Sequence, residues 1–464
     1  MRSLVAAPDV SPDARPLAVI LAAGEGSRLA GHQDGAPKPV LSLLGLSLAE
    51  RTITSCIAAG IERFLVVLGH RVDQVRAHYQ EIAARRQCQV EFVTADDWKL
   101  GNGASLLAAA DTVAGETFLL TMSDHLITPS LIKKILRSRP REDGICLAVD
   151  RDKTGVFDVD DVTKVVLSDN RVVRIGKSLE QWDAADTGVF FCTRALFEAL
   201  RQARTQERHS LTDGVSELAT AGQVKAVDVS GESWIDVDTP KAFREARRRL
   251  LTNLTKGGED GYVSVRLNRP ISTRISARLV STEITPNQIT VISFLISLLG
   301  AGLLSVGQYA VVLVGGLLVQ LASVIDGCDG EIARLKHMSS ARGAWLDTVL
   351  DRYADMAVAL AVTYAFATAH AGPLPWIVGF LAAFGFIMAS YVTKEFVIRT
   401  RRPYPNDIFN RLKRRDLRIL LICLGAVVGR PFEALALAGL LSHVCVVGVL
   451  IKGWKRGGIR QRTA

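Results

Sequence analysis

The segment D-G-C-D-G-E-I-A-R-L-K-H-M-S-S-A-R-G-A-W-L-D-T-V-L-D, from Asp326 to Asp351, decides how the second half of this chain folds. Its aspartates form two pairs, Asp326 with Asp329 and Asp347 with Asp351. Spacings of three and four residues put each pair on one face of a helix. The segment therefore predicts two helices whose acidic faces meet at one cation.

Apolar runs surround this acidic segment, and each is long enough, or nearly so, to cross a hydrocarbon core about 30 Å thick. A carboxylate inside such a run costs several kcal/mol unless it is paired or metal-bound, so it marks a functional site. The alternative interpretation is a structural salt-bridge network with Arg334, Arg342 and Arg352. The six runs cover residues 289–307, 309–325, 344–367, 374–392, 417–429 and 432–451.

The spacing D-x2-D-G-x2-A-R-x8-G-x3-D-x3-D resembles the signature of the CDP-alcohol phosphotransferase family. The resemblance implies that Asp326, Asp329 and Asp347 bind Mg²⁺ or Mn²⁺, and that Asp351 deprotonates the attacking alcohol and adds a further metal ligand. It also implies a nucleotide contact surface and a substrate contact just upstream. These residues are Gly330, Ala333, Arg334 and Gly343 for the nucleotide, and Arg269 for the substrate.

A second motif, L-A-V-I-L-A-A-G-E-G-S-R-L from Leu17 to Leu29, runs from a short apolar strand into a glycine-rich turn. Exposed N–H groups at such a turn form an anion nest, and Arg28 and Lys38 add positive charge where a triphosphate would lie. The pattern resembles the nucleotidyltransferases that make nucleotide sugars and CDP-alcohols. By that resemblance Lys38 and Arg28 are catalytic, and the triphosphate is held by Ala23, Gly24, Gly26 and Ser27.

Three further segments fit the same family, although each alone could be a turn or a helix cap. Asp124 ends an apolar strand, and alternation sends Asp236 and Asp238 of W-I-D-V-D to one face, so these carboxylates are expected to bind Mg²⁺ or Mn²⁺. His125 is expected to be structural. The resemblance assigns the base-recognition loop to Gly101, Asn102 and Gly103, and the acceptor-phosphate side to Lys177 and Asp186.

The periodicity predicts two folded parts. Apolar strands at 18–22, 63–68, 90–94, 118–121 and 145–149 alternate with helical segments, which predicts a Rossmann-like α/β domain with a mostly parallel sheet. We expect a nucleotidyltransferase domain over residues 1–245, an amphipathic linker and juxtamembrane helix over 246–280, and an all-α, six-helix transmembrane domain over 281–464.

Charge and cysteine content agree with this division. From Thr282 onward 19 Lys and Arg face 11 Asp and Glu, so +8 of the overall +9 belongs to the membrane part, and a nucleic-acid partner is not expected. Basic residues gather on alternate loops, which predicts a multi-pass protein of the cytoplasmic membrane with both termini and both active sites in the cytoplasm. The seven cysteines lack C-x2-C pairing and are expected to be reduced. We expect no signal peptide, and a homodimer by resemblance.

Two active sites on one chain limit each other's substrates. The second would consume a CDP-alcohol, so the first should use CTP, and this arrangement resembles the family of bifunctional inositol-1-phosphate cytidylyltransferases and di-myo-inositol-phosphate-phosphate synthases. The resemblance implies CTP, inositol 1-phosphate and CDP-inositol as ligands. Another polyol phosphate or a lipid acceptor such as diacylglycerol fits the same architecture, and a membrane-anchored scaffold with degenerate sites is a hypothesis of another class.

Overall fold

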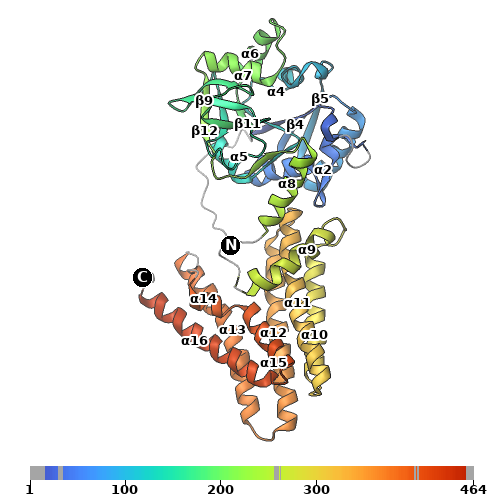
Figure 1. Ribbon diagram of the computed structural model, residues 1–464, viewed down its shortest axis with the longest axis vertical. Helices are drawn as coiled ribbons and strands as arrows, with labels where there is room; N and C mark the ends of the chain where they lie inside the picture. The colour runs from blue at the N-terminus through green and yellow to red at the C-terminus, as the bar shows by residue number, and fades with distance from the viewer. Residues whose placement is uncertain are drawn as a thin grey trace. The chain divides into compact units, whose positions relative to one another are not determined.

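The computed structural model describes residues 16–29, 35–254, 261, 263–401, 404 and 407–455. The chain forms two compact units, Ala7–Arg249 and Leu250–Ala464. Helix α8 (Pro240–Thr252) runs through this division, so the predicted boundary at residue 245 falls inside a continuous helix. Figure 1 shows the two units as an α/β body and a body of helices.

A nine-stranded sheet forms the centre of the first unit, in the order β5-β4-β1-β6-β11-β8-β12-β10-β9. Four neighbouring strands are parallel, from β5 across to β6, and β12 is parallel to β8. The strands are β1 (Leu17–Ala22), β4 (Arg63–Leu68), β5 (Gln89–Thr94), β6 (Phe118–Met122), β8 (Ile145–Asp150), β9 (Lys164–Ser168), β10 (Arg171–Gly176), β11 (Ala184–Cys192) and β12 (Val224–Asp228).

The sheet is mixed, which differs from the mostly parallel sheet that the sequence predicted. Strand β11 lies between β6 and β8 and runs antiparallel to both, and it also pairs antiparallel with β9. Strand β10 is antiparallel to β9 and β12. A run of apolar residues shows that a strand is buried, but it carries no information about the direction of the strand.

Helices cover both faces of this sheet (Figure 1). Side chains that alternate along β1 therefore enter two different hydrophobic cores, one on each face. Leu17, Val19 and Leu21 enter one hydrophobic core, whereas Ala18 and Ile20 enter the other. The first core includes residues of α3 (Asn102–Leu107), α4 (Ala110–Val113), α6 (Ala195–Arg204) and α7 (Leu211–Thr220), and the second includes residues of α1 (Leu48–Ala59), α2 (Val72–Arg86) and α5 (Pro129–Leu136).

Short elements complete the unit and position the site. Strands β7 (His125–Ile127) and β13 (Trp234–Asp236) pair antiparallel, and their register places Asp236 opposite His125. Strands β2 (Ser42–Leu43) and β3 (Leu46–Ser47) form a small hairpin. Single 3₁₀ turns occur at η1 (Ser27–Leu29), η3 (Lys38–Val40) and η4 (Trp98–Leu100). Residues far apart in sequence thus meet at the carboxyl ends of β1 and β6.

The second unit consists of helices. Four of its described helices, α10, α11, α13 and α16, are long and apolar enough to cross a membrane. Helix α12, which carries several charged residues, and α15, which has 13 residues, do not meet that description, so the six-span count stays a prediction. The elements are η5 (Ser264–Asn268), α9 (Arg269–Leu279), α10 (Pro286–Leu304), α11 (Tyr309–Leu335), α12 (Ala341–Ala369), α13 (Leu374–Thr400), α14 (Ile408–Leu412), α15 (Arg415–Val427) and α16 (Pro431–Lys455).

Small residues let these helices approach closely. A Cβ added at Gly300 of α10 would lie 2.9 Å from the Gly315 carbonyl oxygen of α11, and one at Gly439 of α16 would lie 2.6 Å from Cα of Ala382 in α13. Helices in lipid associate through such close backbone packing, because burial of apolar side chains from water does not drive them together there. Close van der Waals packing of the backbones therefore stabilises the bundle at these contacts.

All seven cysteines are free thiols, and six of them are buried, whereas Cys88 is half-buried. Burial of Cys88 raises the pKa of its thiol. The reduced state of these cysteines stays a prediction.

Candidate active sites

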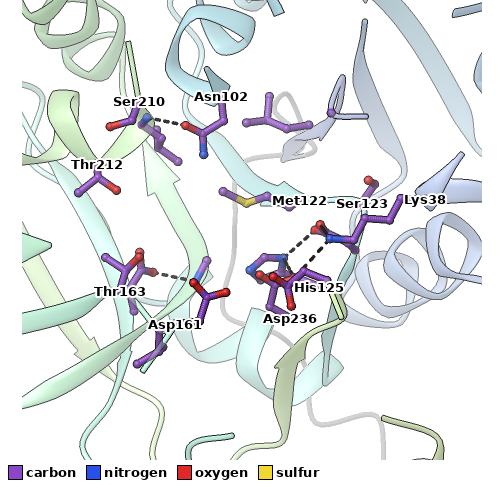
Figure 2. Close-up of a pocket in the computed structure, with 18 of the residues that line it drawn as sticks. Lys38, Asn102, Met122, Ser123, His125, Asp161, Thr163, Ser210, Thr212 and Asp236 are labelled. Atoms are coloured by element: carbon purple, nitrogen blue, oxygen red, sulfur yellow. Dashed lines mark hydrogen bonds and ion pairs between the residues drawn. The ribbon is translucent and has the colours of Figure 1, made fainter. Parts of the chain in front are cut away.

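A cavity of about 520 Å³ opens where β1 and β6 end in the first unit. Its lining combines the glycine-rich turn after β1 with carboxylates from several other segments. Figure 2 labels ten of the lining residues, among them Lys38, Asp161 and Asp236. Ser27, Arg28 and Gly103 are not among the described residues that line it. The predicted residues that do line it are Ala23, Gly24, Gly26, Lys38, Gly101, Asn102, Asp124, Lys177, Asp186, Asp236 and Asp238.

A compact cluster on one side of this cavity contains Lys38, His125 and Asp236, as Figure 2 shows. Asp124 joins it through contacts with Lys38 and His125. Lys38 Nζ forms an ion pair with Asp124 and lies 3.8 Å from Asp236 Oδ1. His125 Nδ1 lies 2.9 Å from Asp124 Oδ1. Gly26 has φ of +66°, and a Cβ there would lie 2.8 Å from Cβ of Lys38, so the glycine turn allows the lysine to pack against it.

The charged groups of this cluster shift one another's pKa values. Burial opposes ionisation of Asp124, yet Lys38 and His125 keep its pKa below the usual value. Burial would lower the pKa of His125, but Asp236 and Asp124 raise it to about 9. Burial and the nearby Asp124 raise the pKa of Asp236 to about 6. Such opposed shifts of neighbouring groups are typical of active sites.

The same cluster fits a divalent cation. Donor atoms of Asp124, His125 and Asp236 lie within 4.8 Å of one another. Asp236 Oδ1 is buried and has no hydrogen-bond partner among the described residues, so an acceptor is available in the cluster. His125, which the sequence suggested to be structural, therefore lies among the candidate ligands.

Gly188 of β11 provides the space that the His125 ring occupies. Its φ is +71°, and an added Cβ would overlap His125 Nε2 and Cδ2. We expect Gly188→Ala to destabilise the first unit by about 1 kcal/mol or more, because the left-handed backbone disfavours a side chain and the ring must also move. The midpoint temperature for unfolding of the first unit, measured by differential scanning calorimetry, reports this loss of stability.

Gly231→Ala is the matched control for this variant. Gly231 has φ of +83°, but no other atom of the described residues lies within 4 Å of the added Cβ. Both variants carry the backbone penalty, and only Gly188→Ala carries the overlap with His125. Equal losses in the two variants would contradict the overlap as the cause.

On the other side of the cavity, basic residues are held by carboxylates. Arg28 donates to Asp161 at 2.8 Å and to Asp238 at 2.6 Å, and Lys177 Nζ pairs with Asp161 at 2.6 Å. Hydrogen bonds from Lys177 and Arg28 lower the pKa of Asp161, although its partial burial opposes them. Asp238, predicted as a metal ligand, is thus engaged by Arg28 and lies outside the group formed by Asp124, His125 and Asp236.

The predicted base-recognition loop is tied to the start of α7. Asn102 Oδ1 accepts from the backbone N–H of Leu211 at 2.7 Å (Figure 2 shows Asn102 next to Ser210). Gly101 has φ of +152°, and a Cβ on Gly101 or Gly103 would lie 2.7 Å from the His209 carbonyl oxygen. The glycines therefore allow close backbone packing, and Asn102 and Gly101 line the cavity.

Asp186 lines the same cavity from β11. Its Oδ1 accepts from the Gly188 N–H at 2.7 Å, and burial raises its pKa to about 6. The predicted acceptor side therefore contains the half-buried Asp186 and the exposed ammonium of Lys177.

A second cavity, of about 400 Å³, lies in the helical unit. Asp326, Asp347 and Asp351 line it, together with Arg269 and Arg415. Carboxylate oxygens of Asp326, Asp329 and Asp347 lie within 4.8 Å of one another, so three of the four signature aspartates from α11 and α12 fit one divalent cation.

Hydroxyl groups of α10 orient two of these carboxylates. Thr290 Oγ1 donates to Asp329 at 2.6 Å, and Ser293 Oγ donates to Asp326 at 3.1 Å. The helix that carries them begins with a capping box at Thr285, followed by Pro286 at the first helical position. The T-P-N sequence of Thr285 to Asn287 thus marks the start of the helix that carries both hydroxyls.

Asp351 is set apart from the other three aspartates. It is not part of the group of described residues whose oxygens could share a cation. Its Oδ1 instead lies 2.7 Å from Arg415 NH1 at the start of α15. Asp351 therefore lies outside the candidate ligand group, although the sequence suggested it as a further metal ligand.

The remaining predicted residues of this site have structural contacts. Arg334 NH2 donates to the Leu254 carbonyl oxygen at 3.0 Å, and a Cβ on Gly330 would lie 3.3 Å from Arg334 NH1. Arg269 donates to the buried Glu331 at 2.7 Å. Gly343 and Ala333 lie on α12 and α11, and among the described residues the cavity lining does not include Gly330, Ala333, Arg334 or Gly343.

Family models match each unit of the chain. The model of the MobA-like NTP transferase domain matches residues 18–221, and that of the CDP-alcohol phosphatidyltransferase matches residues 283–449. A protein of Rubrobacter xylanophilus named bifunctional IPC transferase and DIPP synthase is 38% identical over 92% of this chain and 94% of its own. This chain belongs to the family of bifunctional IPC transferases and DIPP synthases.

Other similar proteins include a bifunctional IPC transferase and DIPP synthase of Aquifex aeolicus, 34% identical over 95% of this chain and 99% of its own. A solved structure of the inositol-1-phosphate CTP transferase from T. maritima is 27% identical, covers 49% of this chain and 90% of its own, and has a TM-score of 0.45. Like its family, this protein is an enzyme that joins a nucleotidyltransferase to a CDP-alcohol phosphotransferase.

Several polar residues of this family member were not predicted from the sequence. Ser293 follows Thr290 by three residues on α10, so the helix phase after the T-P-N start could have indicated both hydroxyls. Asp161 lies in a loop between β8 and β9, and no pattern marks it. Arg415 was visible only as one member of a basic loop, because its carboxylate partners come from other helices.

Proposed function

We propose that this protein makes CDP-inositol from CTP and inositol 1-phosphate in its first unit, and that its second unit transfers inositol phosphate from CDP-inositol to another inositol 1-phosphate. One observation carries the proposal. The chain has two separate groups of candidate ligands, each fitting a divalent cation and each with members that line a cavity of its own unit, in a family whose relatives are named for two activities.

In the first reaction, a phosphate oxygen of inositol 1-phosphate attacks the α-phosphorus of CTP. The bond to the bridging oxygen breaks, and pyrophosphate leaves. Lys38 is buried beside the carboxylates and keeps its charge, because Asp124 and Asp236 outweigh its desolvation and raise its pKa. Its ammonium can therefore stabilise negative charge on the phosphoryl oxygens. Gly24 and Gly26 line the cavity, and we assign the triphosphate to their turn.

In the second reaction, a hydroxyl of the acceptor attacks the phosphorus that carries inositol in CDP-inositol. The bond from that phosphorus to the CMP oxygen breaks, giving phosphorylated di-myo-inositol phosphate and CMP. We assign Asp351 to take the proton from the attacking hydroxyl. Arg269 and Arg414 line the cavity and supply positive charge for a phosphorylated acceptor.

We assign Mg²⁺ or Mn²⁺ to both sites, since carboxylate oxygens are the donors these ions prefer. Asp124, Asp236 and His125 would hold it in the first, and Asp326, Asp329 and Asp347 in the second. A bound divalent cation would neutralise charge on the phosphoryl oxygens and on the leaving group.

We also propose that the protein is a multi-pass protein of the cytoplasmic membrane, with both termini and both sites in the cytoplasm, and that it is a homodimer. The four apolar helices support the membrane assignment. The excess of Lys and Arg on alternate loops supports the orientation.

Phosphorus NMR of the detergent-solubilised protein tests the proposed function. With CTP, Mg²⁺ and inositol 1-phosphate, we expect CDP-inositol and pyrophosphate first, and then a phosphodiester and CMP. Turnover only with a different polyol phosphate would replace the substrate. CMP release only when a lipid acceptor is added would replace the acceptor, and no turnover with any of these would favour a scaffold.

A further inference from the structure

Arg415 joins three carboxylates from two other helices. Its NH1 lies 3.2 Å from Asp326 Oδ2 of α11 and 2.7 Å from Asp351 Oδ1 of α12, and its Nε donates to Asp355 Oδ1 at 3.0 Å. The arginine side chain is 15% exposed, so the contacts are largely shielded from water. One guanidinium nitrogen thus lies between a candidate metal ligand and the candidate base.

The guanidinium is itself held in place. Asp355, which is 3% exposed, accepts from Arg352 at 3.0 Å and lies 3.3 Å from Arg418 NH2. Arg418 in turn lies over the Phe386 ring, 4.5 Å from its centroid. Because the planar guanidinium has a rigid arrangement of donors, anchoring Nε to Asp355 fixes the direction in which NH1 points.

This contact explains why Asp351 stands apart from the other signature aspartates. Asp351 follows Asp347 by one helical turn and faces the same cavity, yet only Asp347 belongs to the group of three whose oxygens could share a cation. Without Arg415, Asp351 would keep only the more distant Arg352 NH2, 3.8 Å from its Oδ2, and its Oδ1 would be free to approach a divalent ion. A metal-bound carboxylate cannot accept the proton of the acceptor hydroxyl as readily.

We propose that Arg415 is a positioning residue that keeps Asp351 out of the metal coordination shell and fixes it relative to Asp326, so that three aspartates bind the cation and the fourth remains a base. The inference rests on the proposed function of the second site. Arg415 thus separates the carboxylate that acts as a base from the carboxylates that bind the metal. This role is distinct from binding the acceptor phosphate.

The test uses the full chain in detergent, with Arg415→Gln and Arg415→Lys supplied with CDP-inositol and inositol 1-phosphate. For Arg415→Gln we expect kcat of CMP release to fall on the order of 10²-fold, as for a misplaced general base, with KM for inositol 1-phosphate within about threefold of the wild type. Affinity for Mn²⁺, measured by electron paramagnetic resonance without substrate, should be equal or higher, since a positive charge is removed and Asp351 is released.

Arg415→Lys keeps the positive charge but lacks the planar guanidinium, whose separate nitrogens contact Asp351 and Asp355 at the same time. Its kcat should therefore also fall, but by less than the kcat of Arg415→Gln. Cytidylyl transfer by the same samples reports that the first unit is folded, and retained Mn²⁺ binding with an unchanged KM reports that the second unit is folded. Arg399→Gln is the matched control, because Arg399 is 68% exposed and pairs only with the i−4 residue Glu395 among the described contacts.

Three results would overturn the inference. A tenfold or larger rise in KM for inositol 1-phosphate with kcat retained would make Arg415 an acceptor-phosphate ligand. Loss of Mn²⁺ binding in Arg415→Gln would make it a support of the metal ligands themselves. Wild-type kcat in Arg415→Lys would show that charge alone suffices. Failure of the wild type to release CMP from CDP-inositol would instead overturn the proposed function, independently of the variants.

Discussion

Asp351→Asn should stop the second reaction and leave the first intact, so that CDP-inositol accumulates. Asparagine preserves the size of the side chain and can still accept a hydrogen bond from Arg415, which lies 2.7 Å from Asp351 Oδ1. It cannot accept a proton from the acceptor hydroxyl. Loss of a general base typically costs 10²- to 10⁴-fold, and we expect a fall of roughly 10³-fold in kcat for CMP release.

The measurement is CMP release from supplied CDP-inositol, alongside pyrophosphate release from CTP in the same sample. Glu395→Gln is the control, because Glu395 pairs with Arg399 away from the described lining of the second cavity. CMP release by Asp351→Asn within a few-fold of the wild type would remove Asp351 as the base. Loss of both activities would point to misfolding.

Lys38→Met should stop the first reaction and leave the second reaction intact. The methionine retains most of the length of the side chain but removes the ammonium that pairs with Asp124 and lies 3.8 Å from Asp236 Oδ1. Removal of one preorganised donor to a developing charge typically costs 10²- to 10³-fold, and the loss here should be at least on the order of 10²-fold in pyrophosphate release. CMP release from supplied CDP-inositol should remain at the wild-type rate.

Lys133→Met provides the matched control, since Lys133 is exposed on α5 and does not line the first cavity among the described residues. A mixture of the Lys38→Met and Asp351→Asn proteins should regain product formation, because CDP-inositol made by one can diffuse to the other. Normal pyrophosphate release by Lys38→Met would remove Lys38 from the catalytic machinery.

The sequence predicted the elements of this fold better than their connections. All five strands named from the sequence are present within a residue or two of the expected bounds, because short buried apolar runs between turns are a local signal. The antiparallel insertion of β11 was missed, since the order and direction of strands depend on contacts between residues far apart in the chain. Helices α12 and α15 were also visible as apolar runs.

In the candidate sites, too, local spacing was predictable from the sequence, whereas contacts between distant segments were not. The spacing within Asp326 to Asp351 placed its aspartates on helix faces, and the structure brings three of them together. Partners from other segments were not predictable, because Asp161 and Arg415 acquire their roles only when separate segments fold next to Arg28 and Asp351. The pairing of β7 with β13 likewise brings His125 beside Asp236 across more than a hundred residues of sequence.

The distribution of cysteines makes selective chemical labelling possible. Six thiols are buried, and only Cys88, between α2 and β5, is half-buried. Buried thiols are shielded from reagents, so a maleimide dye should attach first at Cys88 while the protein remains folded. The native chain therefore already offers one preferred attachment point for a fluorophore on its nucleotidyltransferase unit, without any engineered substitution.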